Sequence, residues 1–270
     1  MHVVIASLVG AVLLGALQGL TEFLPVSSSG HLALAQAFVT VPGDDVLFDV
    51  MLHIGTLAPA IWFFWPQIAE ILRDLVSGDA PWWERRGVRM AWLVIVASVP
   101  TAVIGLALED WFEAQFSDMW SLGIGFAISG ALLWWTRARD GGHLGLMEVP
   151  TWAAFVIGVA QGAAISPSIS RSGATIAAAL LLGLERQVAI ELSFLMSIPA
   201  ISGAVLLSAR KADVSGVVWP EVLGGTVTSL VVGYASLVLL VRLVQRGQLS
   251  AFSWYLWLLA LASFGLAWSA

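Results

Sequence analysis

The sequence contains no cysteine, and only 11% of its residues are charged. The absence of cysteine excludes disulfide bonds, thiol catalysis and thiolate metal sites. Soluble domains carry about a quarter charged residues, so the low share here excludes an ordinary soluble domain. With 59% hydrophobic residues, the 270-residue chain is predicted to be an integral membrane protein. Its net charge of −6 argues against a nucleic-acid partner.

Long apolar stretches predict six transmembrane helices, because a full crossing of the bilayer needs roughly 20 residues. These stretches lie at about residues 47–65, 88–108, 119–135, 188–209, 217–241 and 252–268. Shorter apolar runs at 32–41, 152–165 and 174–184 flank two polar stretches that contain proline, 18–31 and 161–175. We therefore expect an all-α membrane protein with six transmembrane helices and two re-entrant helical hairpins.

The two halves of the chain resemble each other at an offset of 143 residues, the separation of Gly15 from Gly158. The Gly-Ala-Leu-Gln-Gly segment that starts at Gly15 matches Gly-Val-Ala-Gln-Gly from Gly158, and Ser-x-Ser-Gly recurs at 27–30 and 170–173. Short, interrupted segments at matching places are typical of an inverted repeat that holds a site near the bilayer midplane. We predict a single membrane domain with repeat one at about 1–140 and repeat two at about 141–270, their hairpin tips meeting mid-membrane.

Basic residues predict the orientation of the chain. With the termini outside, the loops that then face inward, together with the adjoining edge of one crossing, hold Arg73, Arg85, Arg86, Arg89, Arg137, Arg139, Arg186, Arg242 and Arg246. The outer loops hold only Arg210 and Lys211. Positive charge collects on the cytoplasmic side of membrane proteins. The first hairpin is therefore expected to enter from the outside and the second from the cytoplasm.

Reactive groups gather in the first polar stretch. Gln18 and Glu22 lie four residues apart and so project from one helix face. A carboxylate in a membrane segment is a functional candidate by default. After Pro25, the serines 27–29 and the next helix N-terminus suit an oxyanion, and His31 follows them.

The second polar stretch supplies the cation. Arg171 is the only arginine away from the loops, it is flanked by Ser170 and Ser172, and Thr175 follows. A guanidinium group fits phosphate well. The residue types in the two stretches together favour phosphoryl transfer over proton or cation transport.

At these residues the sequence resembles a known family. Gln18-Gly-Leu-Thr-Glu22-Phe-Leu-Pro-Val-Ser-Ser-Ser-Gly-His31 is similar to the first signature of the bacterial undecaprenyl-diphosphate phosphatases, the bacitracin-resistance BacA family. Pro167-Ser-Ile-Ser-Arg171-Ser-Gly-Ala-Thr175 resembles the second signature, except that Ser168 stands where the family has glycine. Gln18 is an accepted alternative to glutamate in the family pattern, and it leaves a single carboxylate here.

The resemblance implies a hydrolase of the bacterial inner membrane that removes the terminal phosphate of undecaprenyl diphosphate, a polyprenyl lipid. The product would re-enter peptidoglycan and other envelope-polymer synthesis. The resemblance also implies an outward-facing site, dependence on a divalent cation (Mg²⁺ or Ca²⁺) and a possible homodimer. The expected catalytic residues are Glu22, Ser28, His31 and Arg171, and the expected phosphate-binding residues are Gln18, Ser27, Ser29, Ser170, Ser172 and Thr175.

The roles of these residues remain open at this point. Glu22 could ligate the metal or act as general base. The nucleophile could be Ser28, His31 or a water activated by Glu22. His53, in a predicted crossing, could equally satisfy a contact between helices. The competing class is a lipid-phosphate flippase, which would need the same phosphate-binding groups but no nucleophile.

Overall fold

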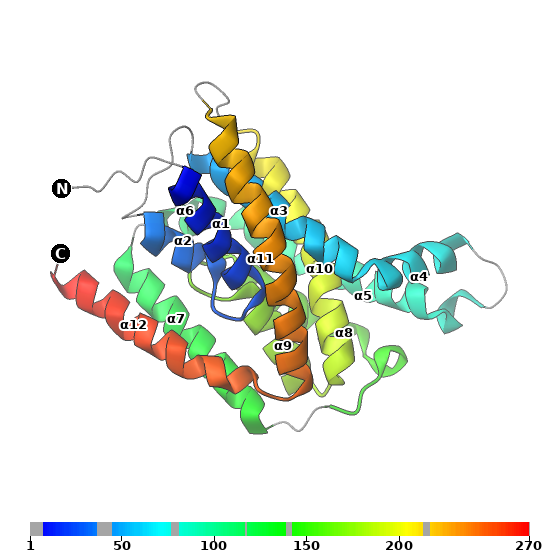
Figure 1. Cartoon of the computed structure of the whole chain (residues 1–270). Coiled ribbons are helices and arrows are strands. Elements are labelled where there is room, and N and C mark those ends of the chain that lie inside the picture. The colour runs from blue at the N-terminus through cyan, green and yellow to red at the C-terminus, as the bar shows by residue number, and fades with distance from the viewer. Residues whose placement is uncertain are drawn as a thin grey trace.

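The computed structural model describes residues 8–36, 45–76, 81–116, 118–138, 142–212 and 217–269. Within these ranges all regular elements are helical (Figure 1). The α-helices are α1 (Leu8–Phe23), α2 (Ser28–Gln36), α3 (Asp45–Phe63), α4 (Trp65–Val76), α5 (Arg86–Ala107), α6 (Glu109–Gln115), α7 (Met119–Trp135), α8 (Thr151–Ala163), α9 (Arg171–Leu181), α10 (Arg186–Ser208), α11 (Trp219–Gln245) and α12 (Phe252–Ser269).

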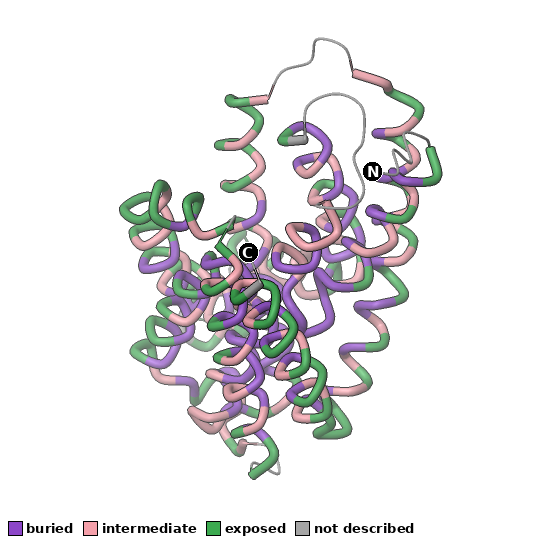
Figure 2. Tube along the Cα trace, turned by 90° about the vertical axis from the view of Figure 1, so that its left-hand side faces the viewer, coloured by how far each residue is buried: buried purple, intermediate pink, exposed green. Residues whose placement is uncertain are grey.

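In the described part of the chain, six helices are long and apolar enough to cross a membrane, and this confirms the predicted number. They are α3, α5, α7, α10, α11 and α12. Three of them continue through a proline, at Pro59, Pro100 and Pro199. Transmembrane helices tolerate proline because neighbouring groups satisfy the freed backbone atoms. Buried residues lie in the middle of the molecule, while the outward helix faces are exposed (Figure 2).

Two shorter apolar helices, α1 with 16 residues and α8 with 13, each lead through a turn into another short helix. The turn after α1 spans residues 24–27 and leads into α2, and the turn after α8 spans residues 164–170 and leads into α9. The apolar run predicted at 32–41 is helical as far as Gln36, and residues 37–41 lie outside the described residues.

Each of these two helices packs along a long helix from the other half of the chain, α1 along α11 and α8 along α5. Glycine makes both approaches possible. A Cβ atom on Gly15 would lie 2.2 Å from the Gly225 carbonyl oxygen, and one on Gly158 would lie 2.1 Å from the Ala97 carbonyl oxygen. These contacts place the turns after α1 and α8 in the interior of the molecule.

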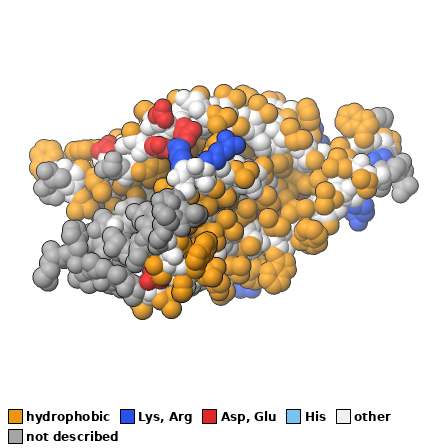
Figure 3. Space-filling model, turned by 90° about the horizontal axis from the view of Figure 1, so that it is seen from above, with side chains coloured by type: hydrophobic (Ala, Val, Ile, Leu, Met, Phe, Trp, Pro, Cys, Tyr) orange, Lys and Arg blue, Asp and Glu red, His pale blue; other side chains and the backbone are white. Residues whose placement is uncertain are grey.

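The loops between the long helices fall into two groups at opposite ends. At one end, Lys211 after α10 binds Glu109 at 2.9 Å and Glu113 at 2.7 Å, both on α6. Figure 3 looks onto this end, where acidic and basic side chains lie side by side within a mostly hydrophobic surface. At the other end, the backbone N–H of Gly142 donates to Leu184 at 3.2 Å, and Arg186 donates to the carbonyl of Gln245 at 3.1 Å.

Candidate active site

The two turns after α1 and α8 lie against each other. The Ser172 hydroxyl, at the start of α9, donates to the carbonyl of Phe23, the last residue of α1, at 2.9 Å. A Cβ on Gly30 would lie 3.0 Å from Cα of Ser168, and one on Gly173 would lie 3.2 Å from Cβ of Pro25. Each segment thus presents a glycine to the turn of the other, and their polar side chains converge.

Glu22 lies at the centre of this junction. Its Oε1 pairs with the guanidinium of Arg171, and its Oε2 accepts hydrogen bonds from Ser28 at 2.6 Å and from Gln18 at 3.1 Å. The Glu22 side chain is only 7% exposed. A buried carboxylate is stable when it is paired and hydrogen-bonded, and Arg171, Ser28 and Gln18 are all site residues predicted from the sequence.

Local backbone geometry directs Ser28 and Arg171 toward Glu22. Ser27 has φ of +69°, in the left-handed region that most residues avoid, and this sharp turn starts α2 at Ser28. Arg171 is likewise the first residue of α9, whose N-terminus is capped by Ser170. Helix N-termini carry partial positive charge, so both helices favour an anion at this point.

Two buried polar atoms at the site have no hydrogen-bond partner, Nη1 of Arg171 and Oε1 of Gln18. Buried polar atoms in native proteins are almost always paired, so an unpaired one indicates a place for a ligand or water. The Arg171 atom is a donor that suits a phosphate oxygen. The Gln18 atom is an oxygen acceptor that suits a hard cation such as Mg²⁺ or Ca²⁺.

His53 on α3 also lies at this site, and the sequence left it evenly balanced between a functional role and a contact between helices. Its Nδ1 donates to the carbonyl of Asp49 at 2.8 Å, and its Nε2 lies 4.0 Å from Oε2 of Glu22. Its side chain is 31% exposed. The only signal in the sequence was a histidine within an apolar crossing, which fits a packing role equally well.

His31 binds two groups other than Glu22. Its Nδ1 lies 2.7 Å from the carbonyl of Ser27, and its Nε2 lies 2.7 Å from the hydroxyl of Tyr255 on α12. The imidazole stacks on the Tyr255 ring with centroids 5.7 Å apart. Both ring nitrogens are therefore engaged within the protein.

The other residues expected to bind phosphate mainly make hydrogen bonds within the protein. The Ser27 hydroxyl contacts that of Ser29 at 3.2 Å, and Ser170 accepts from the backbone N–H of Gly173 at 3.2 Å. Thr175 is fully buried and donates to the carbonyl of Arg171 at 2.9 Å. Thr175 also contacts Ser193 on α10, so its hydroxyl faces into the protein.

Ser168, which replaces the family glycine, adopts the backbone conformation that favours glycine. Its φ is +63°, and its hydroxyl donates to the carbonyl of Leu122 on α7 at 2.6 Å. Ser129 of α7 donates to the carbonyl of Ser168 at 3.1 Å and accepts from the N–H of Ser170 at 3.0 Å. Helix α7 thus holds the second turn in a shape that serine alone would not favour.

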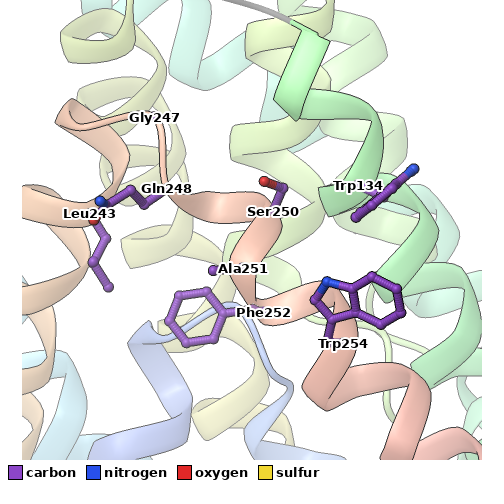
Figure 4. A pocket seen from close by; sticks show the side chains of 8 residues that line it. All are labelled: Trp134, Leu243, Gly247, Gln248, Ser250, Ala251, Phe252 and Trp254. Carbon is purple, nitrogen blue, oxygen red and sulfur yellow. The ribbon is translucent and has the colours of Figure 1, made fainter.

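Two other polar features lie away from this junction. Glu191, buried on α10, accepts hydrogen bonds from Gln67, Arg86 and Gln187 and so connects helices α4, α5 and α10. The pocket in Figure 4 lies at the end of the molecule where Arg186 binds Gln245. It is lined by Trp134, Leu243, Gly247, Gln248, Ser250, Ala251, Phe252 and Trp254. Neither feature contains a residue predicted to act in the site.

The fold and the site define a multi-pass membrane protein in which an arginine, a carboxylate and a serine from two short helical segments meet in the interior. The model of the family described as bacitracin resistance protein BacA matches residues 11–262. The chain belongs to this family.

Similar proteins carry the name undecaprenyl-diphosphatase. That of Carboxydothermus hydrogenoformans is 40% identical over 254 residues, which cover 92% of this chain and 93% of that protein. That of Desulfosudis oleivorans is 43% identical over 264 residues, covering 92% and 94%. That of Syntrophotalea carbinolica is 41% identical over 263 residues, covering 94% and 96%.

Proposed function

We propose that this chain is an integral-membrane hydrolase that removes the terminal phosphate of undecaprenyl diphosphate. The undecaprenyl phosphate released would serve cell-envelope polymer synthesis. The observation that carries the proposal is the contact of Ser28 with Glu22 at 2.6 Å, beside an arginine with a free buried N–H group. The names of the relatives support the same reaction and do not favour a flippase.

Ser28 is the nucleophile in this proposal. Its oxygen attacks the terminal phosphorus, the bond from that phosphorus to the bridging oxygen breaks, and undecaprenyl phosphate leaves. The proton of Ser28 passes to Glu22, whose Oε2 already accepts it. Water then hydrolyses the phosphoserine and releases inorganic phosphate. His31 is a poorer nucleophile in this geometry because Ser27 and Tyr255 occupy both of its nitrogens.

Arg171 neutralises charge on the phosphoryl oxygens. One of its terminal nitrogens holds Glu22, and Nη1 is left to donate to the phosphate. The N-termini of α2 and α9 add partial positive charge at the same place. Ser170 and Ser172 act indirectly, because their hydroxyls are bound within the protein.

Glu22 and Gln18 would hold the divalent cation that the family resemblance implies. The described residues contain no group of three or more His, Cys, Asp or Glu side chains that could hold a metal alone. Mg²⁺ is commonly bound by one or two carboxylates together with substrate phosphates. The Glu22 carboxylate and the unpartnered Gln18 oxygen fit that arrangement. Bound there, the cation would supply further charge neutralisation for the diphosphate.

A second carboxylate at position 18 tests whether Glu22 and Gln18 hold the cation. We expect Gln18→Glu to raise the apparent affinity for Mg²⁺ or Ca²⁺, because it adds a second carboxylate. The readout is the rise in unfolding temperature of the detergent-solubilised protein with cation concentration, which requires no turnover. An unchanged cation dependence in Gln18→Glu and in Glu22→Gln would place the cation elsewhere.

The architecture we propose is an inverted repeat with two re-entrant hairpins, α1–α2 and α8–α9. Three observations support it. Gly15 and Gly158 occupy matching places and pack on helices of the opposite half, Gly30 and Gly173 each face the other turn, and Ser28 and Arg171 each begin a helix. The repeats would cover about 1–140 and 141–270.

We also propose the inner bacterial membrane as location, with the active site open to the periplasmic side. The two groups of loops described above support this, because Lys211 and the acidic residues of α6 share one end and most arginines belong to loops of the other. Arg139 lies outside the described residues. Because the chain has no cysteine, single cysteines at Lys211 or Gln187 can be labelled with a membrane-impermeant thiol reagent. From the periplasm, only the first should react.

The direct test of function is phosphate release from undecaprenyl diphosphate by the purified protein in detergent with Mg²⁺ or Ca²⁺. Wild type should release phosphate, and Ser28→Ala and Arg171→Ala should not. Lipid binding without release in the wild type would favour the flippase instead. The homodimer stays a prediction, which the mass of the protein–detergent complex in light scattering would check.

A further inference from the structure

We propose that Tyr255 is a positioning residue for the reaction and acts through His31 on the turn that presents Ser28. This inference rests on the proposed function. It concerns a tyrosine on the last helix, 224 positions from its partner in the chain, to which the sequence patterns gave no role.

The hydrogen bonds determine which His31 nitrogen carries the proton. A backbone carbonyl can only accept, so Nδ1, at 2.7 Å from the carbonyl of Ser27, must donate. In the neutral imidazole Nε2 is then the acceptor, and the Tyr255 hydroxyl donates to it at 2.7 Å. Tyr255 therefore stabilises the one tautomer that can bind Ser27. Stacking of the two rings, 14° from parallel, holds the imidazole in that orientation.

The Ser27 carbonyl connects the His31–Tyr255 pair to the turn that presents Ser28. It accepts from Nδ1 of His31 and also from the backbone N–H of His31 at 3.3 Å. Ser27 is in the left-handed region, which costs a non-glycine residue of order 1–3 kcal/mol and persists only when its surroundings hold it. The next residue is Ser28, whose hydroxyl must stay against Glu22. Losing the Tyr255 hydroxyl would remove the hydrogen bond that selects this tautomer and would weaken the hold of His31 on the Ser27 conformation.

Tyr255 is well placed for removal of its hydroxyl alone. It is 44% exposed, so phenylalanine fits without repacking the core and keeps the ring stack. The other tyrosine of the chain, Tyr234, offers a matched control. It is 40% exposed on α11 and makes ring contacts with Trp62 and Phe63, away from His31.

The first measurement is the steady-state kinetics of phosphate release. We expect Tyr255→Phe to lower kcat about fivefold to tenfold, the size of effect that the loss of one hydrogen bond positioning Ser28 would have, with KM nearly unchanged. KM should hold because Arg171 and Gln18 are untouched. Tyr234→Phe should match wild type. Kinetics of Tyr255→Phe equal to those of Tyr234→Phe would overturn the proposal.

A double-mutant cycle tests whether Tyr255 acts through His31. In a His31→Ala background, Tyr255→Phe should change kcat by less than twofold, because the group that relays its effect is gone. If the kcat losses of the two single variants multiply in the double variant, Tyr255 acts by another route and the inference is wrong. If wild type and Tyr234→Phe release no phosphate, the proposed function fails instead.

Hydrogen–deuterium exchange tests the positioning without turnover. The amides of residues 27–31 should exchange faster in Tyr255→Phe than in wild type or Tyr234→Phe, while residues 170–175 stay unchanged. Equal exchange at residues 27–31 in all three proteins would contradict the inference, whatever the activity.

Discussion

The two turns that meet at Glu22 share one unusual backbone conformation but carry different functional groups. Each contains a serine in the left-handed region, Ser27 with φ of +69° and Ser168 with φ of +63°. The first turn is held by the side-chain contact of His31 with Tyr255 on α12, and the second by hydroxyl and carbonyl groups of α7. The first segment carries the carboxylate and the serine that we propose as nucleophile, and the second carries the arginine. Because the charges are divided between the segments, neither is complete without the other.

Removing Arg171 should have the largest effect, because it breaks this division of charge. Arg171→Ala leaves the buried Glu22 without its positively charged side-chain partner, which we expect to cost about 3–5 kcal/mol of stability. It also removes a hydrogen-bond donor to the phosphate, which should lower kcat by about 10²–10³-fold. Thermal unfolding in detergent and the phosphate-release assay measure the two effects.

A neutral pair separates the two effects of Arg171. The double variant Glu22→Gln with Arg171→Gln should recover most of the lost stability, because no unpaired charge remains buried, and should stay inactive. If the double variant is no more stable than Arg171→Ala, the ion pair does not stabilise the junction.

A methyl group added at Gly158 should disrupt the close packing of α8 against α5. In Gly158→Ala the new Cβ would lie 2.1 Å from the Ala97 carbonyl oxygen, so the helices must move apart. We expect a loss of about 1–3 kcal/mol, as for other overpacked positions, and a lower unfolding temperature. Gly203→Ala is the control, since a Cβ on Gly203 would meet no atom within 4 Å. Equal unfolding temperatures in the two variants would exclude a packing role for Gly158.

The turn serines offer a smaller and more selective test. Ser168→Gly relieves the left-handed strain but loses the hydrogen bond to Leu122, so the net change in stability should stay within about 1 kcal/mol. Ser168→Ala keeps the strain and loses the bond, so its unfolding temperature should be the lower of the two. If Ser168→Ala is as stable as wild type, α7 does not hold this turn through Ser168.

The smallest expected effect is pH-dependent and concerns the start of α7. The Ser121 hydroxyl, together with backbone N–H groups, donates to the Asp118 carboxylate and holds the pKa of Asp118 below its usual range. A lowered folded-state pKa stabilises the protein above the usual aspartate pKa, near 3.9, and the contribution disappears as the pH falls below the folded-state value. Asp118→Asn should therefore be slightly less stable than wild type at neutral pH, and the difference in unfolding temperature should vanish in acid. A difference independent of pH would exclude the carboxylate charge as its cause.

The sequence alone predicted much of the fold, because crossing a bilayer demands long apolar helices that stand out in any chain. All six crossings were recognised in this way. The pairing of Gln18 with Glu22 follows from helical spacing. Arg171 stood out as the only arginine away from the loops, and the structure pairs it with Glu22.

The remaining features depend on contacts between distant parts of the chain, which no local pattern encodes. His31 closely follows the serines 27–29 in sequence, yet its ring contacts Tyr255, while His53 from a separate helix lies near Glu22. Thr175 matches the signature pattern, but one further helical turn brings its hydroxyl against Ser193. The backbone conformation of Ser168 was equally hidden, since serine gives no sign of a left-handed turn.

The most direct test of the account is to trap the phosphorylated enzyme. Wild type is mixed with undecaprenyl diphosphate labelled in its terminal phosphate, quenched within one turnover in sodium dodecyl sulfate at neutral pH, and mapped by peptide mass spectrometry before and after acid treatment. The account predicts an acid-stable phosphoserine at Ser28 that is absent from Ser28→Ala. An acid-labile label on His31, or phosphate release that persists in Ser28→Ala, would contradict it.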